Sequence, residues 1–143
     1  MANYKGFTRT NYFSVNDAEK FRQIIADSYC SEGDIEVFED DTCESIKFCF
    51  GCYGMISGIR TLPDGSDDDV SEYDAFVDAL QSVLADGDAI IITEVGYEKL
   101  RYLIGHSYII TKSDVQFVSL RDKAIEEARN MLNNPEYDTK MEY

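Results

Sequence analysis

The sequence contains four cysteines and one histidine, which are the side chains best suited to a metal or redox centre. Cys49 and Cys52 are separated by two intervening residues, a spacing that zinc sites use, and Cys43 and His106 could complete the ligand set. The pair lies in an apolar pattern typical of a strand, where positions three apart point to opposite faces unless Gly51 forms a bulge. We therefore expect reduced structural thiols and no cofactor, with a zinc site made of these four side chains as the alternative.

The segment that starts at Asp64 is rich in oxygen-bearing side chains and resembles a calcium-binding loop. Asp64, Ser66 and Asp68 occupy alternating ligand positions. Asp69 replaces the glycine needed at the sixth position, and Ala75 replaces the glutamate needed at the twelfth. The segment therefore predicts a solvated turn.

The sequence gives little support for catalysis. A nucleophile–histidine pair would have to use His106, and neither a nucleophile elbow nor a phosphate-binding glycine loop is present. Because the chain is so rich in acids, a pair of neighbouring carboxylates is not evidence for a hydrolytic active site. We expect a protein that is not an enzyme.

Acidic charge is the dominant feature, with a net charge of -15 from 28 acids and 13 bases. Residues 32–45 and 64–78 hold seven acids each and no base, so acids and bases nearly balance in the rest of the chain. A surplus concentrated in this way favours a face that binds a basic protein surface. It disfavours direct binding to nucleic acid or to an anionic membrane.

The spacing of these acids resembles the spacing of phosphates along a nucleic-acid strand. Carboxylates four residues apart on a helix, such as Asp74 and Asp78 or Asp68 and Glu72, stand about 6 Å from each other. Carboxylates two residues apart on a strand, such as Asp34 and Glu36, are separated by about the same distance. The chain could therefore mimic DNA on a basic protein. The predicted contact set is Glu32, Asp34, Glu36, Asp40, Asp41, Asp67, Asp68, Asp69, Glu72, Asp74 and Asp78.

Hydrophobic periodicity predicts the elements that position these side chains. Strands are expected over residues 6–15, 34–39, 45–51, 53–62, 89–95, 100–104, 108–111 and 115–118. Helices are expected from Asn16 or Asp17 to Tyr29 with a stop at Gly33, from a Ser71 cap with Asp74 to Gly87, and over residues 121–133. The last helix should turn one stripe inward, made of Ala124, Ile125, Ala128, Met131 and Leu132.

The order of these elements predicts an α+β fold, with a mostly antiparallel sheet and helices packed on one face. Matches at an offset of 54 residues, such as Phe48 with Tyr102 and Gly51 with Gly105, favour two strand–helix–strand–strand repeats plus a C-terminal helix, although so few identities can also arise by chance. We expect a single domain over residues 1–134 and a polar, flexible tail over 135–143. The chain has no apolar run of membrane-spanning length and no signal-peptide hydrophobic region, which predicts a cytoplasmic protein.

Three stretches of the chain resemble a family. The segments NYFSVNDAEKF (residues 11–21), FGCYG (50–54) and YEKLRY (97–102) are similar to small acidic accessory proteins carried by conjugative elements and phages of Gram-positive bacteria. Such elements often carry acidic anti-restriction or anti-CRISPR proteins, so the resemblance implies a function of this kind. It assigns no catalytic residue. The expected function is an acidic inhibitor that mimics nucleic acid to block a DNA-binding defence nuclease. The alternatives are an immunity or adaptor module that binds a basic partner and, third, a metalloprotein or enzyme. The sequence sets neither the partner's identity nor the oligomeric state.

Overall fold

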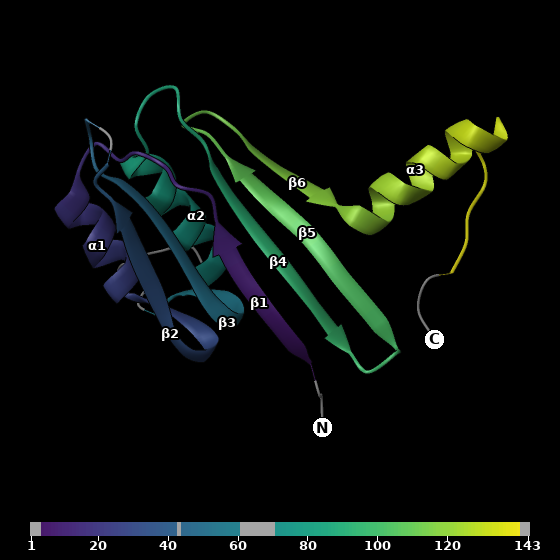
Figure 1. Cartoon of the computed structure of the whole chain (residues 1–143), viewed down its shortest axis with the longest axis horizontal. Coiled ribbons are helices and arrows are strands. Elements are labelled where there is room, and N and C mark those ends of the chain that lie inside the picture. The colour runs from purple at the N-terminus through teal and green to yellow at the C-terminus, as the bar shows by residue number, and fades with distance from the viewer. Residues whose placement is uncertain (1–3, 43, 61–70, 141–143) are drawn as a thin grey trace.

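Six strands form one antiparallel sheet in the order β2-β3-β1-β4-β5-β6 (Figure 1). The computed structural model describes residues 4–42, 44–60 and 71–140. Three helices complete an α+β fold, which confirms the predicted class. In chain order the elements are β1 (Lys5–Thr10), α1 (Ala18–Ala26), β2 (Ser28–Asp40), β3 (Lys47–Ile59), α2 (Glu72–Val83), β4 (Ile90–Glu98), β5 (Tyr102–Ile110), β6 (Val115–Ser119) and α3 (Leu120–Leu132).

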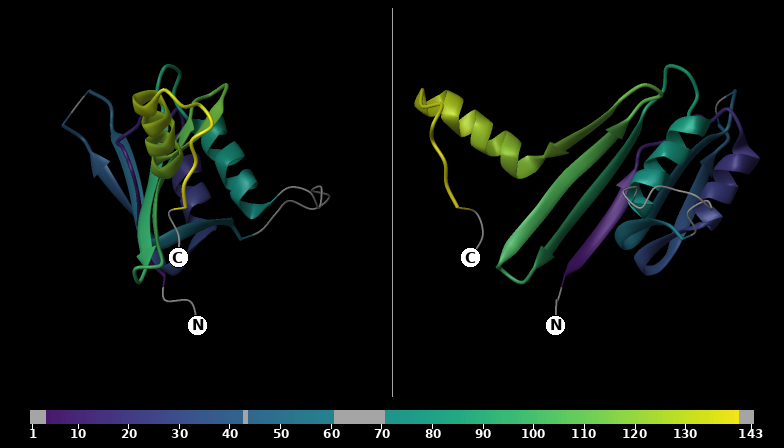
Figure 2. Two further views of the ribbon diagram at one scale, coloured as in Figure 1. Left: turned by 90° about the vertical axis from the view of Figure 1, so that its right-hand side faces the viewer. Right: turned by 180° about the vertical axis from the view of Figure 1, so that it is seen from behind.

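Helices α1 and α2 cover one face of the sheet, which we call the inner face (Figure 2). The core between them is aromatic: Phe21 and Phe76 from the helices pack against Phe50 of β3 with ring centroids 6.3 and 6.0 Å apart. Helix α2 reaches across to β5, where Tyr73 contacts Tyr108. The opposite, outer face has no helix packed flat on it in the described chain.

The helix starts lie where their caps predict. The Asp17 carboxylate accepts from the Lys20 N–H, and the Ser71 hydroxyl accepts from the Asp74 N–H, both at 3.0 Å. Each cap satisfies a backbone donor that the first turn leaves unpaired. Helix α1 ends at Ala26, three residues earlier than predicted, because Ser28 starts β2.

Several strands are longer and less interrupted than predicted, whereas β1 is shorter, because it ends at Thr10 and not at residue 15. Gly33 was expected to stop α1, but it lies inside β2 in a left-handed conformation, within a stretch where the β2–β3 register shifts. The expected break at Cys52 does not occur, since β3 runs unbroken from Lys47 to Ile59, and β5 likewise joins two predicted strands. The second predicted repeat therefore has no separate first strand.

Helix α3 extends from the end of β6 and projects away from the body of the molecule (Figures 1 and 2). The prediction that its whole apolar stripe turns inward is wrong. Ile125 is buried, Ala128 is half-buried, and Ala124, Met131 and Leu132 are exposed. Beyond the helix, the Arg129 Nε donates to the Tyr137 carbonyl at 2.6 Å, which ties part of the C-terminal segment to α3.

Candidate functional site

The first acidic set lies on β2, the outermost strand at one end of the sheet. Glu32, Asp34 and Glu36 are exposed there. Glu36 pairs with Gly51, which in turn pairs with Arg9, so the Glu36 side chain belongs to the outer face. The β2 edge therefore presents three carboxylates within five residues of one strand.

Two of the acids near the turn between β2 and β3 form contacts with other residues of the protein. Asp40 accepts two hydrogen bonds from Thr42, one from the hydroxyl at 2.6 Å and one from the backbone N–H at 3.0 Å, and these bonds lower the pKa of the Asp40 carboxyl. Glu39 points to the inner face, where it pairs with Arg22 of α1 at 2.6 Å. Asp41 is exposed.

The second acidic set is only partly within the described chain. Asp74 and Asp78 are exposed one turn apart on α2, as the helical spacing predicts. Glu72 is half-buried, and its hydrogen bond is the main cause that raises the pKa of Tyr29. Asp64, Asp67, Asp68 and Asp69 lie outside the described residues, as does the calcium-like pattern. Glu72 therefore also contacts the protein itself, whereas Asp74 and Asp78 are the exposed members of this set within the described chain.

The described acids of the two sets do not form one row. Glu36 belongs to the outer face, whereas Asp74 and Asp78 lie on α2, above the inner face. The β2 acids lie at the sheet edge and α2 spans the middle of the sheet (Figure 1). A single partner would contact both sets only by wrapping around the β2 end of the molecule.

Cys49 and Cys52 lie on opposite faces of the sheet, as their spacing predicts. Cys49 pairs with Phe38 on the outer face, and its sulfur lies 3.7 Å from Arg9 Nη2, whereas Cys52 pairs with Thr8 on the inner face. Burial, and then the neighbouring Cys30, raises the pKa of Cys52 to about 12, so this thiol is a poor nucleophile. Across the described residues, no three His, Cys, Asp or Glu side chains are grouped so as to hold a metal ion. Cys43 lies outside those residues.

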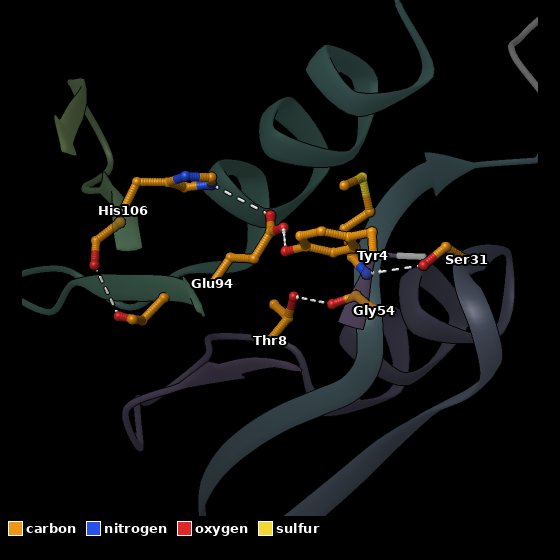
Figure 3. Close-up of polar contacts among 9 residues, drawn as sticks. Tyr4, Thr8, Ser31, Gly54, Glu94 and His106 are labelled. Carbon is orange, nitrogen blue, oxygen red and sulfur yellow. Dashed lines mark hydrogen bonds and ion pairs between the residues drawn. The ribbon is translucent and has the colours of Figure 1, made fainter. Parts of the chain in front are cut away.

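A polar cluster that sequence reasoning missed is centred on Glu94 of β4 (Figure 3). Glu94 is 9% exposed, and its two carboxylate oxygens have different partners. Tyr4 donates its hydroxyl to Oε2 at 2.5 Å, and His106 Nε2 lies 3.2 Å from Oε1. The buried carboxylate is therefore contacted at both oxygens, as a buried charge requires.

Strand register and two glycines build this cluster. Glu94 and His106 are direct partners in the β4–β5 ladder, so their side chains share the inner face. The Tyr4 ring lies over Gly6 and Gly96, where any Cβ would overlap it. Two glycines at facing positions of paired strands are the signal in the sequence that could have located a ring packed on the sheet.

A cavity of about 400 Å³ adjoins the cluster below the first turn of α2. Glu94, His106, Tyr73 and Tyr108 line it, and none of its lining residues is Lys or Arg. Burial is the main cause that raises the pKa of both Tyr4 and Tyr73, so these phenols stay protonated. The arrangement supplies no activated nucleophile, and its polar contacts link Tyr4, the residue before β1, to β4 and β5.

Among the described residues, no helix combines the length and the apolar character needed to cross a membrane. Comparisons of the chain with protein-family models, with curated proteins and with solved structures find no match.

Proposed function

We propose that this chain is a non-enzymatic inhibitor that mimics nucleic acid and occupies the basic DNA-binding surface of a defence nuclease. The observation that carries the proposal is the group of three exposed carboxylates, Glu32, Asp34 and Glu36, on the outermost strand. Because β2 is the outermost strand, its exposed side chains are accessible to a channel that normally holds a nucleic-acid strand. Asp41, the residue that follows β2, is exposed as well.

Electrostatics gives this proposal a measurable signature. A basic DNA channel holds its own counterions when empty, and an anionic partner displaces them much as DNA does, so binding should weaken steeply with salt. Each carboxylate that replaces a phosphate contact contributes about one unit to the slope of log K against log salt concentration. Three contacts on β2 therefore account for a slope of about 3.

The test is a triple charge reversal, Glu32→Lys, Asp34→Lys and Glu36→Lys, with a control that changes the net charge equally. Asp86→Lys, Glu136→Lys and Asp138→Lys serve as the control, because these acids are exposed and lie outside both sets. Both proteins compete with a DNA duplex for an RNA-guided nuclease and for a restriction endonuclease from Gram-positive hosts. We expect the β2 variant to lose inhibition and salt dependence, and the control to retain most of both.

Full inhibition by the β2 variant, with its fold intact by circular dichroism, would refute the mimicry proposal. A pulldown from host lysate that recovers a basic toxin or a secretion component, and no nuclease, would favour an immunity or adaptor module instead. The two outcomes are distinguished by partner identity at fixed salt concentration.

A further inference from the structure

The outer face of the sheet exposes a continuous apolar surface across four strands. Phe7 of β1 contacts Tyr53 of β3 with ring centroids 5.5 Å apart, and Val95 of β4 is the ladder partner of Phe7. Leu103 of β5 pairs with Tyr97 of β4, and its side chain is 82% exposed. Monomeric proteins rarely leave so many large apolar side chains together in solvent, so this face marks an interface.

Helix α3 carries a second exposed apolar surface. Leu120, Ala124, Ala128 and Met131 recur at helical spacing, with Leu132 beside them, and Met131 is 82% exposed. Such a stripe on an amphipathic helix normally lies against another surface. In this chain only the first turn of α3 lies beside the sheet, where Leu120 and Ala124 line a groove over the outer face. The helix then projects away from the sheet (Figure 2), so Met131 and Leu132 stay exposed.

We propose that two copies of this chain form a dimer in which each copy lays the α3 stripe across the outer face of the other. The length of α3 is compatible with the width of the apolar surface on the outer face. Helix α3 has 13 residues and is thus about 20 Å long. The apolar surface runs from β5 to β3, three strand spacings or about 14 Å, before the width of the side chains is added.

A groove already exists at the place where the partner helix would lie. Its volume is about 780 Å³, and it lies between Phe7, Val95 and Leu103 on the outer face and the first turn of α3. From their exposed fractions, Phe7, Tyr53, Val95, Tyr97, Leu103 and Leu120 together offer roughly 700 Å². This is close to the roughly 800 Å² that each partner contributes to a stable interface.

The charges on these surfaces permit self-association despite the net charge of -15. Neither Asp nor Glu lines the groove, which contains Lys5 and Arg121. Glu127 is exposed on α3, three residues from Ala124 and hence at the border of the stripe. The described acids of β2 lie at the other end of the strand order from β5, and those of α2 lie above the inner face, so two copies joined through their outer faces would not bring these acids together.

The first test is the mass of the full chain in solution, measured by light scattering at about 0.3 M salt to screen long-range repulsion. The chain is 16.3 kDa, so the expected result is a species of twice that mass. Leu103→Asp is the test variant, and Leu100→Asp is the matched control because Leu100 is 81% exposed in the β4–β5 turn. We expect Leu103→Asp, which appears twice in the dimer, to weaken association at least about 100-fold, and Leu100→Asp to leave it within about threefold.

A second test asks whether α3 contacts the other copy. Met131 is replaced by a photo-crosslinking phenylalanine analogue in unlabelled protein, which is mixed with ¹⁵N-labelled wild-type chain and irradiated. Crosslinked peptides that join position 131 of the unlabelled chain to labelled peptides containing Phe7 or Leu103 are expected. A monomeric wild-type mass at 100 µM, equal effects of Leu103→Asp and Leu100→Asp, or crosslinks confined to one copy would each overturn the proposal.

Discussion

Replacing Gly96 by alanine tests the account of the Glu94 cluster most directly. The Tyr4 ring lies against Gly96, so the new methyl group would overlap the ring. The ring must then leave its position, and its hydroxyl can no longer donate to Glu94. The predicted result is a less stable protein, although alanine is otherwise the better residue in a strand.

The size of the effect follows from two opposing terms. Loss of a hydrogen bond to a buried charged group costs about 1.5–3 kcal/mol. Replacing glycine by alanine stabilises by about 0.4–1 kcal/mol through the unfolded state. The net expectation is a destabilisation of about 1–2 kcal/mol, which lowers the melting temperature by about 2–8 °C in a chain of this size.

The assay is urea unfolding in a double-mutant cycle with Tyr4→Ala. The three atoms nearest to the new methyl group all belong to Tyr4, so without the ring the Gly96→Ala substitution should become neutral or slightly stabilising. Gly105→Ala is the control, because a Cβ there would meet Leu120 at 3.4 Å, an ordinary contact. An equal cost of Gly96→Ala with and without the Tyr4 ring would refute the reasoning.

Two further predictions concern stability. Burial raises the pKa of Cys52 to about 12 from 9.0, and Tyr4 and Tyr73 are also raised, so their stabilisation is full below the unfolded values and is lost as pH rises above about 9. One titrating group changes the free energy of unfolding by at most about 1.4 kcal/mol per pH unit, and partial exposure makes each contribution smaller. Urea midpoints that stay constant or increase from pH 8 to pH 11 would contradict the prediction. Ser71→Ala removes the α2 cap and should cost about 1 kcal/mol, measured against Ser82→Ala; equal costs would count against the cap.

Local signals in the sequence were sufficient for the helix starts and the fold class. The Asp17 and Ser71 caps act within one turn, so their meaning does not depend on the rest of the chain. Glycine was less informative: Gly33 has the left-handed φ typical of a helix stop, yet β3 holds it in a bulged strand. Pairing of β2 with β3 determines that Gly33 lies in a strand, and the amino-acid sequence alone does not reveal this pairing.

The Glu94 cluster shows the same limit at a site. Tyr4 and Glu94 are 90 residues apart, and a lone glutamate in a β-branched run gives no sign of burial. The register of β4 with β5 brings His106 to the same carboxylate. The acidic segments, one on a strand and one on a helix, were easy to find because charge composition and local periodicity need no tertiary information. Only the fold shows that the strand lies at the sheet edge, and that Glu36 and α2 belong to opposite faces of the sheet.

The position of Glu32, Asp34 and Glu36 on an edge strand has a second physical explanation, and the two explanations make different predictions. Charged side chains on an exposed edge prevent strands of different molecules from pairing, and lysine serves that purpose as well as glutamate. Mimicry of nucleic acid requires negative charge specifically. The lysine variant should therefore remain soluble but lose nuclease inhibition, whereas a threonine variant at the same three positions should lose inhibition and also aggregate. If the lysine variant still inhibits, edge protection alone explains the acids on β2.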